Sequence, residues 1–344
     1  VNPPVDSTSP PSADTTTPPP PAPDTTTPPA PDTTTPPPGP PPAQVDPNCI
    51  DGKYIEALPP YTADISAAVN SYSPNNYMGF LDSVLASRYP VGQYLVSTAL
   101  ETSKQGNCID YFLSKKATAK DIIAQMSVFV HECGHFADMA AGVFSFSGME
   151  AAYLITPDMK LMCTQGSGTI NNGPTFARSL IKNDEYNDMR PPCAGFGGGK
   201  NCDFYANVYL DGNPNDSNFE GGDQGFGSVM EEATQYVNSL ATGLAFQDFV
   251  GGAVSERDGI LTFLWYIQRY LRMARLQYPE VYPIITNDCW REVILTVWGR
   301  AWLYLEATED IGKLGISDDA IMALVMRPEL LEEIQRVRDL EGCQ

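Results

Sequence analysis

The chain has 344 residues, with 42 acidic side chains against 21 basic ones and a net charge of -21. This charge argues against nucleic acid or an anionic membrane as a partner, because phosphates would be repelled rather than neutralised. The sequence contains no run of about 18 apolar residues, so we expect no membrane span, and we expect a protein that works outside the cell.

The first 48 residues differ in composition from the rest of the chain. The sequence Asp-Thr-Thr-Thr-Pro-Pro occurs three times there, beginning at Asp14, Asp24 and Asp32. Such a segment has little apolar surface to bury, so it cannot offset the entropy lost on folding. We therefore predict a disordered Pro/Thr-rich linker or stalk over residues 1–48 and a folded domain over residues 49–344. The segment serves either as a spacer or as a remnant of processing.

The folded part has mainly helical periodicity. Helices are predicted over 61–88, with a break near Ser73-Pro74, and over 121–141, where Thr118 to Asp121 forms a cap and Gly142 ends the helix. Residues 142–227 are dense in Gly, Asn, Asp and Pro, which predicts irregular structure with short extended pieces, for example over 204–210. Further helices are predicted over 228–246, 256–278, 290–305, 318–326 and 328–340.

These elements predict a mainly α fold with a small β portion. The last five helices form a C-terminal helical subdomain, about 228–344, that closes over the functional site. Four tryptophans fall at core-like spacing in these helices and are interpreted as packing residues: Trp265, Trp290, Trp298 and Trp302.

The helix over 121–141 carries the only two histidines of the chain, in the pentapeptide His131-Glu132-Cys133-Gly134-His135. Residues four apart lie on one face of a helix, so both imidazoles can reach a single metal ion. Glu132 projects about 100° around the helix from His131, close enough to act on a metal-activated water without being a ligand. The pattern predicts a metal site with His131 and His135 as ligands and Glu132 as the catalytic residue.

A third protein ligand is still needed, because catalytic zinc sites use three and leave one position open. The continuation that supplies a third histidine in metzincins is absent, since Asp138 occupies its glycine position and Ala141 its histidine position. We therefore expect a carboxylate. The candidates are Glu232, Glu231, Asp138, Glu150 and Glu185. Asp138 could instead be a hydrogen-bond partner of an imidazole.

The segment Met230-Glu231-Glu232-Ala233-Thr234-Gln235-Tyr236 lies on a predicted helix downstream of the histidines. Together with the pentapeptide it resembles the gluzincin branch of zincin metallopeptidases, of which thermolysin is the familiar member. Glu232-Ala233 is similar to the Glu-Ala-x-x-Asp segment of that family, although Tyr236 stands at the aspartate position. The resemblance covers the two helices only.

The resemblance implies a zincin-like catalytic domain that binds Zn²⁺ through His131, His135 and Glu232. It implies hydrolysis of peptide bonds in a protein or peptide substrate, with Glu132 as general base. An oxyanion donor besides the metal is expected among four tyrosines: Tyr153, Tyr205, Tyr209 and Tyr236.

The eight cysteines, an even number, indicate disulfides and an oxidising compartment. Cys193 and Cys202 bracket a Gly-rich loop, and Cys49 and Cys343 lie at the two ends of the folded region, so both pairs are predicted disulfides. Cys133 lies on the side of its helix away from the metal. We expect it to be a core thiol or to pair with a nearby cysteine such as Cys163.

The sequence thus favours a secreted, monomeric zinc metallopeptidase. The absence of a signal peptide before Val1 fits a mature, processed chain. The alternative is a non-catalytic surface or binding protein that retains a zincin-like fold.

Overall fold

A computed structural model describes residues 49, 56–104, 106–145, 148–164, 176, 178–194, 201–210 and 225–343. The chain divides into two compact units, Val1–Pro37 and Pro38–Gln344, and all described residues belong to the second. The predicted linker over residues 1–48 lies outside the described residues.

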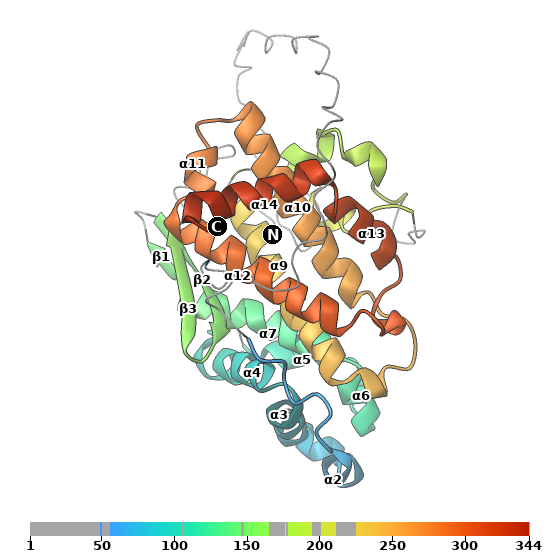
Figure 1. The fold of residues 1–344 in the computed structure, drawn as a ribbon. Coiled ribbons are helices and arrows are strands. Elements are labelled where there is room, and N and C mark those ends of the chain that lie inside the picture. Colours follow the sequence, from blue (N-terminus) through green and yellow to red (C-terminus); the bar gives the residue numbers. More distant parts are fainter. Residues whose placement is uncertain are drawn as a thin grey trace, which may run out of the picture. The chain divides into compact units, whose positions relative to one another are not determined.

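The described part is mainly helical, as the sequence predicts (Figure 1). Its α-helices are α2 Ser66–Asn70, α3 Tyr77–Arg88, α4 Pro90–Thr102, α5 Cys108–Phe112, α6 Ala119–Ile123, α7 Met126–Ala141, α8 Ala206–Tyr209, α9 Gly225–Ala245, α10 Glu256–Gln277, α11 Tyr282–Ile285, α12 Asp288–Ala307, α13 Asp318–Val325 and α14 Pro328–Glu341. Short 3₁₀ turns are η1 Pro74–Asn76, η3 Arg178–Asn183, η4 Asn187–Met189, η5 Gln247–Phe249 and η6 Gly312–Leu314.

A small antiparallel sheet with strand order β1-β2-β3 follows α7 in the chain. The strands are β1 Val143–Ser145, β2 Gly148–Thr156 and β3 Met159–Thr164. Ala152 pairs with Met162, and the tight turn between β2 and β3 closes the hairpin. The sheet is the predicted small β portion, and it packs against α7 and α12.

Helix α9 is the centre of the folded part. It packs against α7, α10 and α12, and most of its residues are buried (Figure 1). Helix α4 covers another side of α7. A helix that is covered on every side places its polar residues inside the protein, so the polar side chains of α9 must find partners there. Several of these side chains form the site described below.

One cluster of buried apolar side chains runs from Cys49 to Cys343. Trp265, Trp290 and Trp298 are buried in it and Trp302 packs against it, which confirms their predicted packing role. The helices α9, α10 and α12 to α14, which the sequence places in a C-terminal subdomain, belong to this same core.

The helix predicted over 61–88 is broken at Ser73-Pro74 as expected, and its regular part is α2 and α3. The helix predicted over 121–141 is divided into α6 and α7. Thr118 and Asp121 form the capping box that begins α6. At the division, the Gln125 amide donates to the Lys115 carbonyl oxygen at 2.6 Å, so a side chain ties the kink to the preceding loop.

The extended piece predicted over 204–210 is wrong, because residues 206–209 form the helical turn α8. The turn begins where the Asp203 carboxylate accepts a hydrogen bond from the Ala206 amide at 3.1 Å. A buried side chain from outside the segment, the Tyr266 hydroxyl, holds Asp203 in place with a hydrogen bond of 2.6 Å. The local apolar pattern does not contain this tertiary contact.

Four disulfides are formed, and the described residues contain no free cysteine. The predicted pairs Cys49–Cys343 and Cys193–Cys202 are confirmed. The suggested pairing of Cys133 with Cys163 is wrong. Cys133 faces α5 and bonds to Cys108, while Cys163 on β3 bonds to Cys289 on α12.

Four disulfides fit a protein that folds in an oxidising compartment. Within the described part of the chain, no helix has the length and apolar character needed to cross a membrane.

Candidate metal centre

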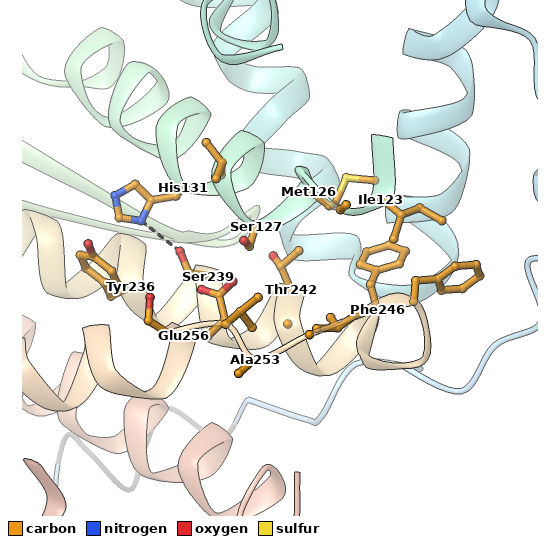
Figure 2. Close-up of a pocket in the computed structure, with 18 of the residues that line it drawn as sticks. Ile123, Met126, Ser127, His131, Tyr236, Ser239, Thr242, Phe246, Ala253 and Glu256 are labelled. Atoms are coloured by element: carbon orange, nitrogen blue, oxygen red, sulfur yellow. Dashed lines mark hydrogen bonds between the residues drawn. The ribbon is translucent and has the colours of Figure 1, made fainter. Parts of the chain in front are cut away.

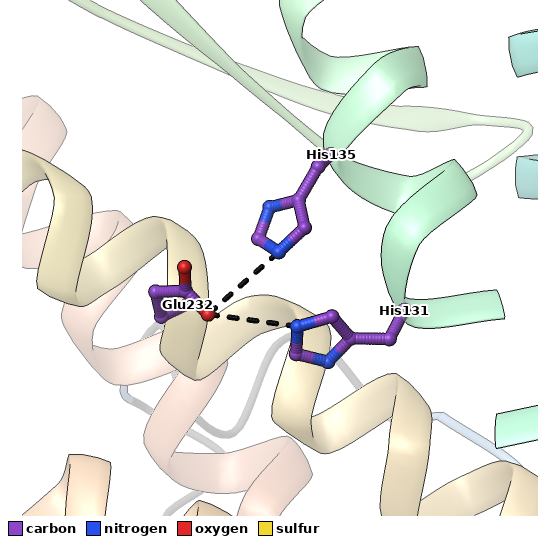
Figure 3. A group of neighbouring side chains, drawn as sticks. All are labelled: His131, His135 and Glu232. Carbon is purple, nitrogen blue, oxygen red and sulfur yellow. Dashed lines mark ion pairs between the residues drawn. The ribbon is translucent and has the colours of Figure 1, made fainter. Parts of the chain in front are cut away.

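Helices α7 and α9 bring the two histidines and one glutamate together. His131 and His135 lie one turn apart on the face of α7 that packs against α9, and Glu232 extends from α9 toward them (Figure 3). The Oε2 atom of Glu232 lies 3.5 Å from Nε2 of His131 and 3.7 Å from Nε2 of His135. Among the described residues these three form a group whose donor atoms all lie within 4.8 Å of one another.

This group fits a metal ion. Tetrahedral coordination with bonds of about 2.1 Å requires donor atoms to lie about 3.4 Å apart, close to the observed carboxylate–imidazole separations. The exposed fractions of the three side chains are only 9% for His131, 8% for Glu232 and 12% for His135. Two imidazole nitrogens and one carboxylate oxygen in a shielded position are a donor set suited to a transition metal.

The other acids considered as third ligand have different partners. Glu231 pairs with Nδ1 of His135, the ring nitrogen that faces away from Glu232. Asp138 accepts hydrogen bonds from the Leu154 amide at 2.7 Å and from the Gln235 side chain at 2.8 Å. Glu185 pairs with Arg272. The side chain of Glu150 lies outside the described residues.

A second set of contacts holds the imidazoles in orientation. Nδ1 of His131 lies 3.0 Å from the Ser239 hydroxyl, and Nδ1 of His135 pairs with Glu231. Both rings therefore present Nε2 to Glu232. Such partners fix the tautomer and direction of a metal-binding histidine.

Ser239 does what the aspartate of the Glu-Ala-x-x-Asp segment would do, while Tyr236 at that position has another role. The ring of Tyr236 packs edge-on against the His131 ring, with 4.7 Å between centroids. Sequence reasoning missed Ser239. The available signal was its spacing, since a residue seven positions after Glu232 lies two helical turns along the same face.

Beyond Glu231, Gln235 links the two helices. Its amide nitrogen donates to Asp138 of α7 and lies 3.3 Å from Glu231 of α9. The close approach depends on Gly134, because a Cβ atom at that position would lie 1.9 Å from Oε1 of Gln235. The glycine inside the pentapeptide thus allows α9 to approach the two histidines.

The electrostatics of the metal-free site favour a bound cation. Burial by itself would lower the pKa of His135, but the nearby carboxylates of Glu231 and Glu232 outweigh it and raise the pKa to about 10. Burial raises the pKa of Glu132, while the positive charges of His131 and His135 act in the opposite direction. Burial also raises the pKa of Asp138, and the charge of Glu231 adds to this effect.

Glu132 opens onto a cavity of about 560 Å³ rather than toward the three donors. His131 and Glu132 line one part of this cavity, and Ile123, Met126 and Phe246 line another (Figure 2). The Oε2 atom of Glu132 is buried and makes no hydrogen bond to any described residue. A carboxylate oxygen with no protein partner beside a cavity is available to a proton on a bound molecule.

Three of the four tyrosines proposed as oxyanion donors line the same cavity: Tyr205, Tyr209 and Tyr236. The hydroxyls of Tyr209 and Tyr236 lie 3.4 Å apart. Burial raises the pKa of Tyr209, and the charges of Glu232 and Glu132 raise it further, so this hydroxyl stays protonated. Tyr153 lies elsewhere and donates to the Gly227 carbonyl oxygen at 3.3 Å.

Comparison of the chain with protein-family models, with curated proteins and with solved structures returned no match. The resemblance to gluzincins therefore rests on the residues of α7 and α9 and on their arrangement.

Proposed function

We propose that this protein is a secreted zinc-dependent metallopeptidase of the zincin type. The observation that carries the proposal is the convergence of His131, His135 and Glu232, with Glu132 beside them at the wall of a cavity. A structural metal site would be closed by a fourth protein ligand, whereas this group supplies three donors.

Zinc is the metal we propose because His₂Glu with one open position is a donor set of catalytic zinc. When bound, the metal would activate a water for attack and polarise the scissile carbonyl. The cavity beside His131 would hold the peptide with that carbonyl near the site.

Glu132 is the proposed general base. Its carboxylate takes the proton of the attacking water and delivers it to the leaving amine. Burial raises the pKa of Glu132, which brings it toward the range in which a carboxyl group both accepts and donates a proton near neutral pH. Tyr209 is the proposed oxyanion donor, since its protonated hydroxyl faces the charges of Glu132 and Glu232.

Metal content and one isosteric variant test the proposal. We expect the purified protein to contain one zinc ion per chain and to hydrolyse peptides until a chelator is added. The variant Glu132→Gln should keep its zinc and lose peptide hydrolysis by at least about a thousandfold, because the proton transfer is lost while the ligands remain.

Loss of zinc in Glu132→Gln would contradict the separation of ligand and base. Full activity of His131→Ala would refute the metal-dependent mechanism. Stoichiometric zinc without hydrolysis of any amide or ester would favour the alternative, a non-catalytic binding protein.

A further inference from the structure

The cavity next to the proposed catalytic residues contains a second carboxyl group, Glu256 at the start of α10. Figure 2 shows its side chain projecting into the cavity opposite Ser127 of α7. Glu256 is separated in sequence from the metal group, and the proposed reaction assigns it no role.

Glu256 differs from the other shielded acids of this protein in having no cationic partner. Asp184 pairs with Arg269 at 2.7 Å, Glu333 with Arg275 at 2.5 Å and Glu56 with Arg300 at 2.5 Å. No described Lys or Arg lies within ion-pair distance of Glu256. A shielded carboxylate without a partner is costly, which indicates that an external group completes it.

The surroundings reinforce this contrast. Two residues along, Asp258 is satisfied by the amides of Ile316 and Ser317, each at 2.7 Å. Lys313 belongs to the segment that bonds to Val254 of the cavity wall, yet its ammonium group binds the Gln247 carbonyl oxygen. The protein therefore has a cation close to the cavity wall but does not use it to neutralise Glu256.

The walls around Glu256 are mostly apolar. They include side chains from α6, α7, the end of α9 and the segment after η5: Ile123, Met126, Phe246, Phe249, Val250 and Val254. Among the described lining residues there is no Lys or Arg, and the only ionisable groups besides the tyrosines are His131, Glu132 and Glu256. Gly243 leaves room for the acid, because a Cβ atom there would lie 3.2 Å from Cγ of Glu256.

We propose that this cavity binds a lysine or arginine side chain of the substrate beside the scissile bond, with Glu256 as the residue that determines specificity. The aliphatic stem lies against the apolar walls, and the cationic head forms a charge-assisted hydrogen bond with Glu256. The net charge of -21 favours the approach of a basic peptide. The inference rests on the proposed function for the word "scissile" only, since binding of the cation needs no turnover.

Peptides that differ at a single side chain test the inference. A set of quenched peptides carries arginine, its uncharged isostere citrulline, or norleucine at each position that flanks the cleaved bond. At one position we expect arginine to exceed citrulline by at least about tenfold in kcat/KM. In Glu256→Gln this ratio should fall to about one, while hydrolysis of the norleucine peptide changes less than about twofold.

The same peptides are also titrated calorimetrically into zinc-loaded Glu132→Gln protein, which does not require hydrolysis. Arginine-selective binding that disappears in the double variant Glu132→Gln, Glu256→Gln supports the inference even if no peptide is cleaved, an outcome that refutes the proposed function alone. Hydrolysis without a preference for arginine over citrulline refutes this inference alone. Absence of arginine-selective binding also overturns it.

The matched control is Glu306→Gln, the same change at an exposed position of α12 outside the cavity. It should keep the arginine preference. Zinc content and melting temperature of Glu256→Gln should equal those of the unchanged protein, and a preference for arginine that persists in Glu256→Gln would show that another group determines it.

Discussion

The two imidazoles of the proposed metal site are oriented by different chemical groups. His131 meets the neutral hydroxyl of Ser239, and His135 meets the carboxylate of Glu231. A carboxylate partner raises the basicity of an imidazole and holds it more strongly than a hydroxyl does. The two supports should therefore contribute unequally to metal binding.

We predict that Glu231→Gln lowers zinc affinity by about 10- to 100-fold, and that Ser239→Ala lowers it by less. Both changes leave the three donor atoms in place. The affinity is measured by competition with a chromophoric chelator, with Glu306→Gln as a control that removes a distant carboxylate. A larger loss in Ser239→Ala than in Glu231→Gln would contradict this ranking of the two contacts.

The protonation of His135 gives a second prediction at this scale. In the metal-free protein the neighbouring carboxylates raise its pKa to about 10, so the ring is charged at pH 7. A metal ion binds only the neutral ring, so zinc binding at pH 7 should release a proton, and affinity should rise with pH up to about 10. Calorimetry in buffers of different ionisation enthalpy measures the released proton. Glu231→Gln should release fewer protons, and an unchanged value in that variant would count against this origin of the shift.

The sign of the effect on stability follows from the same pKa. Because the pKa of His135 is higher in the folded state than its ordinary value of 6.5, its contribution to stability is fully present below about pH 6.5. That contribution is lost as the pH rises toward 10. Denaturant titrations of the metal-free protein between pH 6 and 10 should show this decline. A decline equally steep in His135→Gln would assign it to other groups.

At the scale of elements, the site depends on how closely α7 and α9 approach. Gly134 is the point of contact, and the buried Gln235 that faces it is held by Asp138 and Asn238. Gln235 cannot move aside without breaking these hydrogen bonds. The helix pair is therefore sensitive to the addition of a single methyl group.

We predict that Gly134→Ala lowers the free energy of unfolding by about 1–3 kcal/mol, although alanine is the better helix former. It should also weaken zinc binding, because α9 carries Glu232. Gly252→Ala is the control, since a Cβ atom at Gly252 meets nothing within 4 Å. Thermal unfolding and chelator competition measure the two effects. Stability equal to that of the Gly252→Ala protein would show that the two helices adjust freely.

The elements that sequence reasoning recovered are those with strong local signals. The long helices α9, α10, α12 and α14 have sustained apolar periodicity, and the break at Pro74 and the cap at Thr118 use local chemistry. Helix α4 was missed because Pro90 and Gly92 weaken its local signal. Its glycine instead permits close packing, since a Cβ atom there would lie 3.2 Å from the Val130 side chain of α7.

The sheet and the partners within the site depend on contacts that are distant in sequence. Residues 152–155 of β2 are all buried, so the strand lacks the alternation of a half-exposed strand. At the site, the spacing of His131 and His135 predicts their shared face, which the structure has. The sequence could rank Glu232 above Glu231 only by resemblance, because the difference between them depends on the rotation of α9 against α7.

At the scale of the whole molecule, two disulfides act over very different lengths of chain. Cys49–Cys343 joins residues separated by 294 positions, and Cys193–Cys202 joins residues separated by nine. In the chain-entropy account, a cross-link stabilises the folded state by restricting the unfolded chain, and the effect grows with the logarithm of the closed loop. The first disulfide should therefore stabilise the fold more than the second.

We predict that the double variant Cys49→Ser, Cys343→Ser loses about 5 kcal/mol of unfolding free energy, and that Cys193→Ser, Cys202→Ser loses about 2.5 kcal/mol. Denaturant unfolding of the two variants under non-reducing conditions gives the comparison. The ratio matters more than either value, because local strain affects each loss separately. If the short-range pair proves the more stabilising one, the Cys193–Cys202 bond acts by holding the folded segment around Asp203 in place, which also supports α8 and therefore Tyr209 at the cavity.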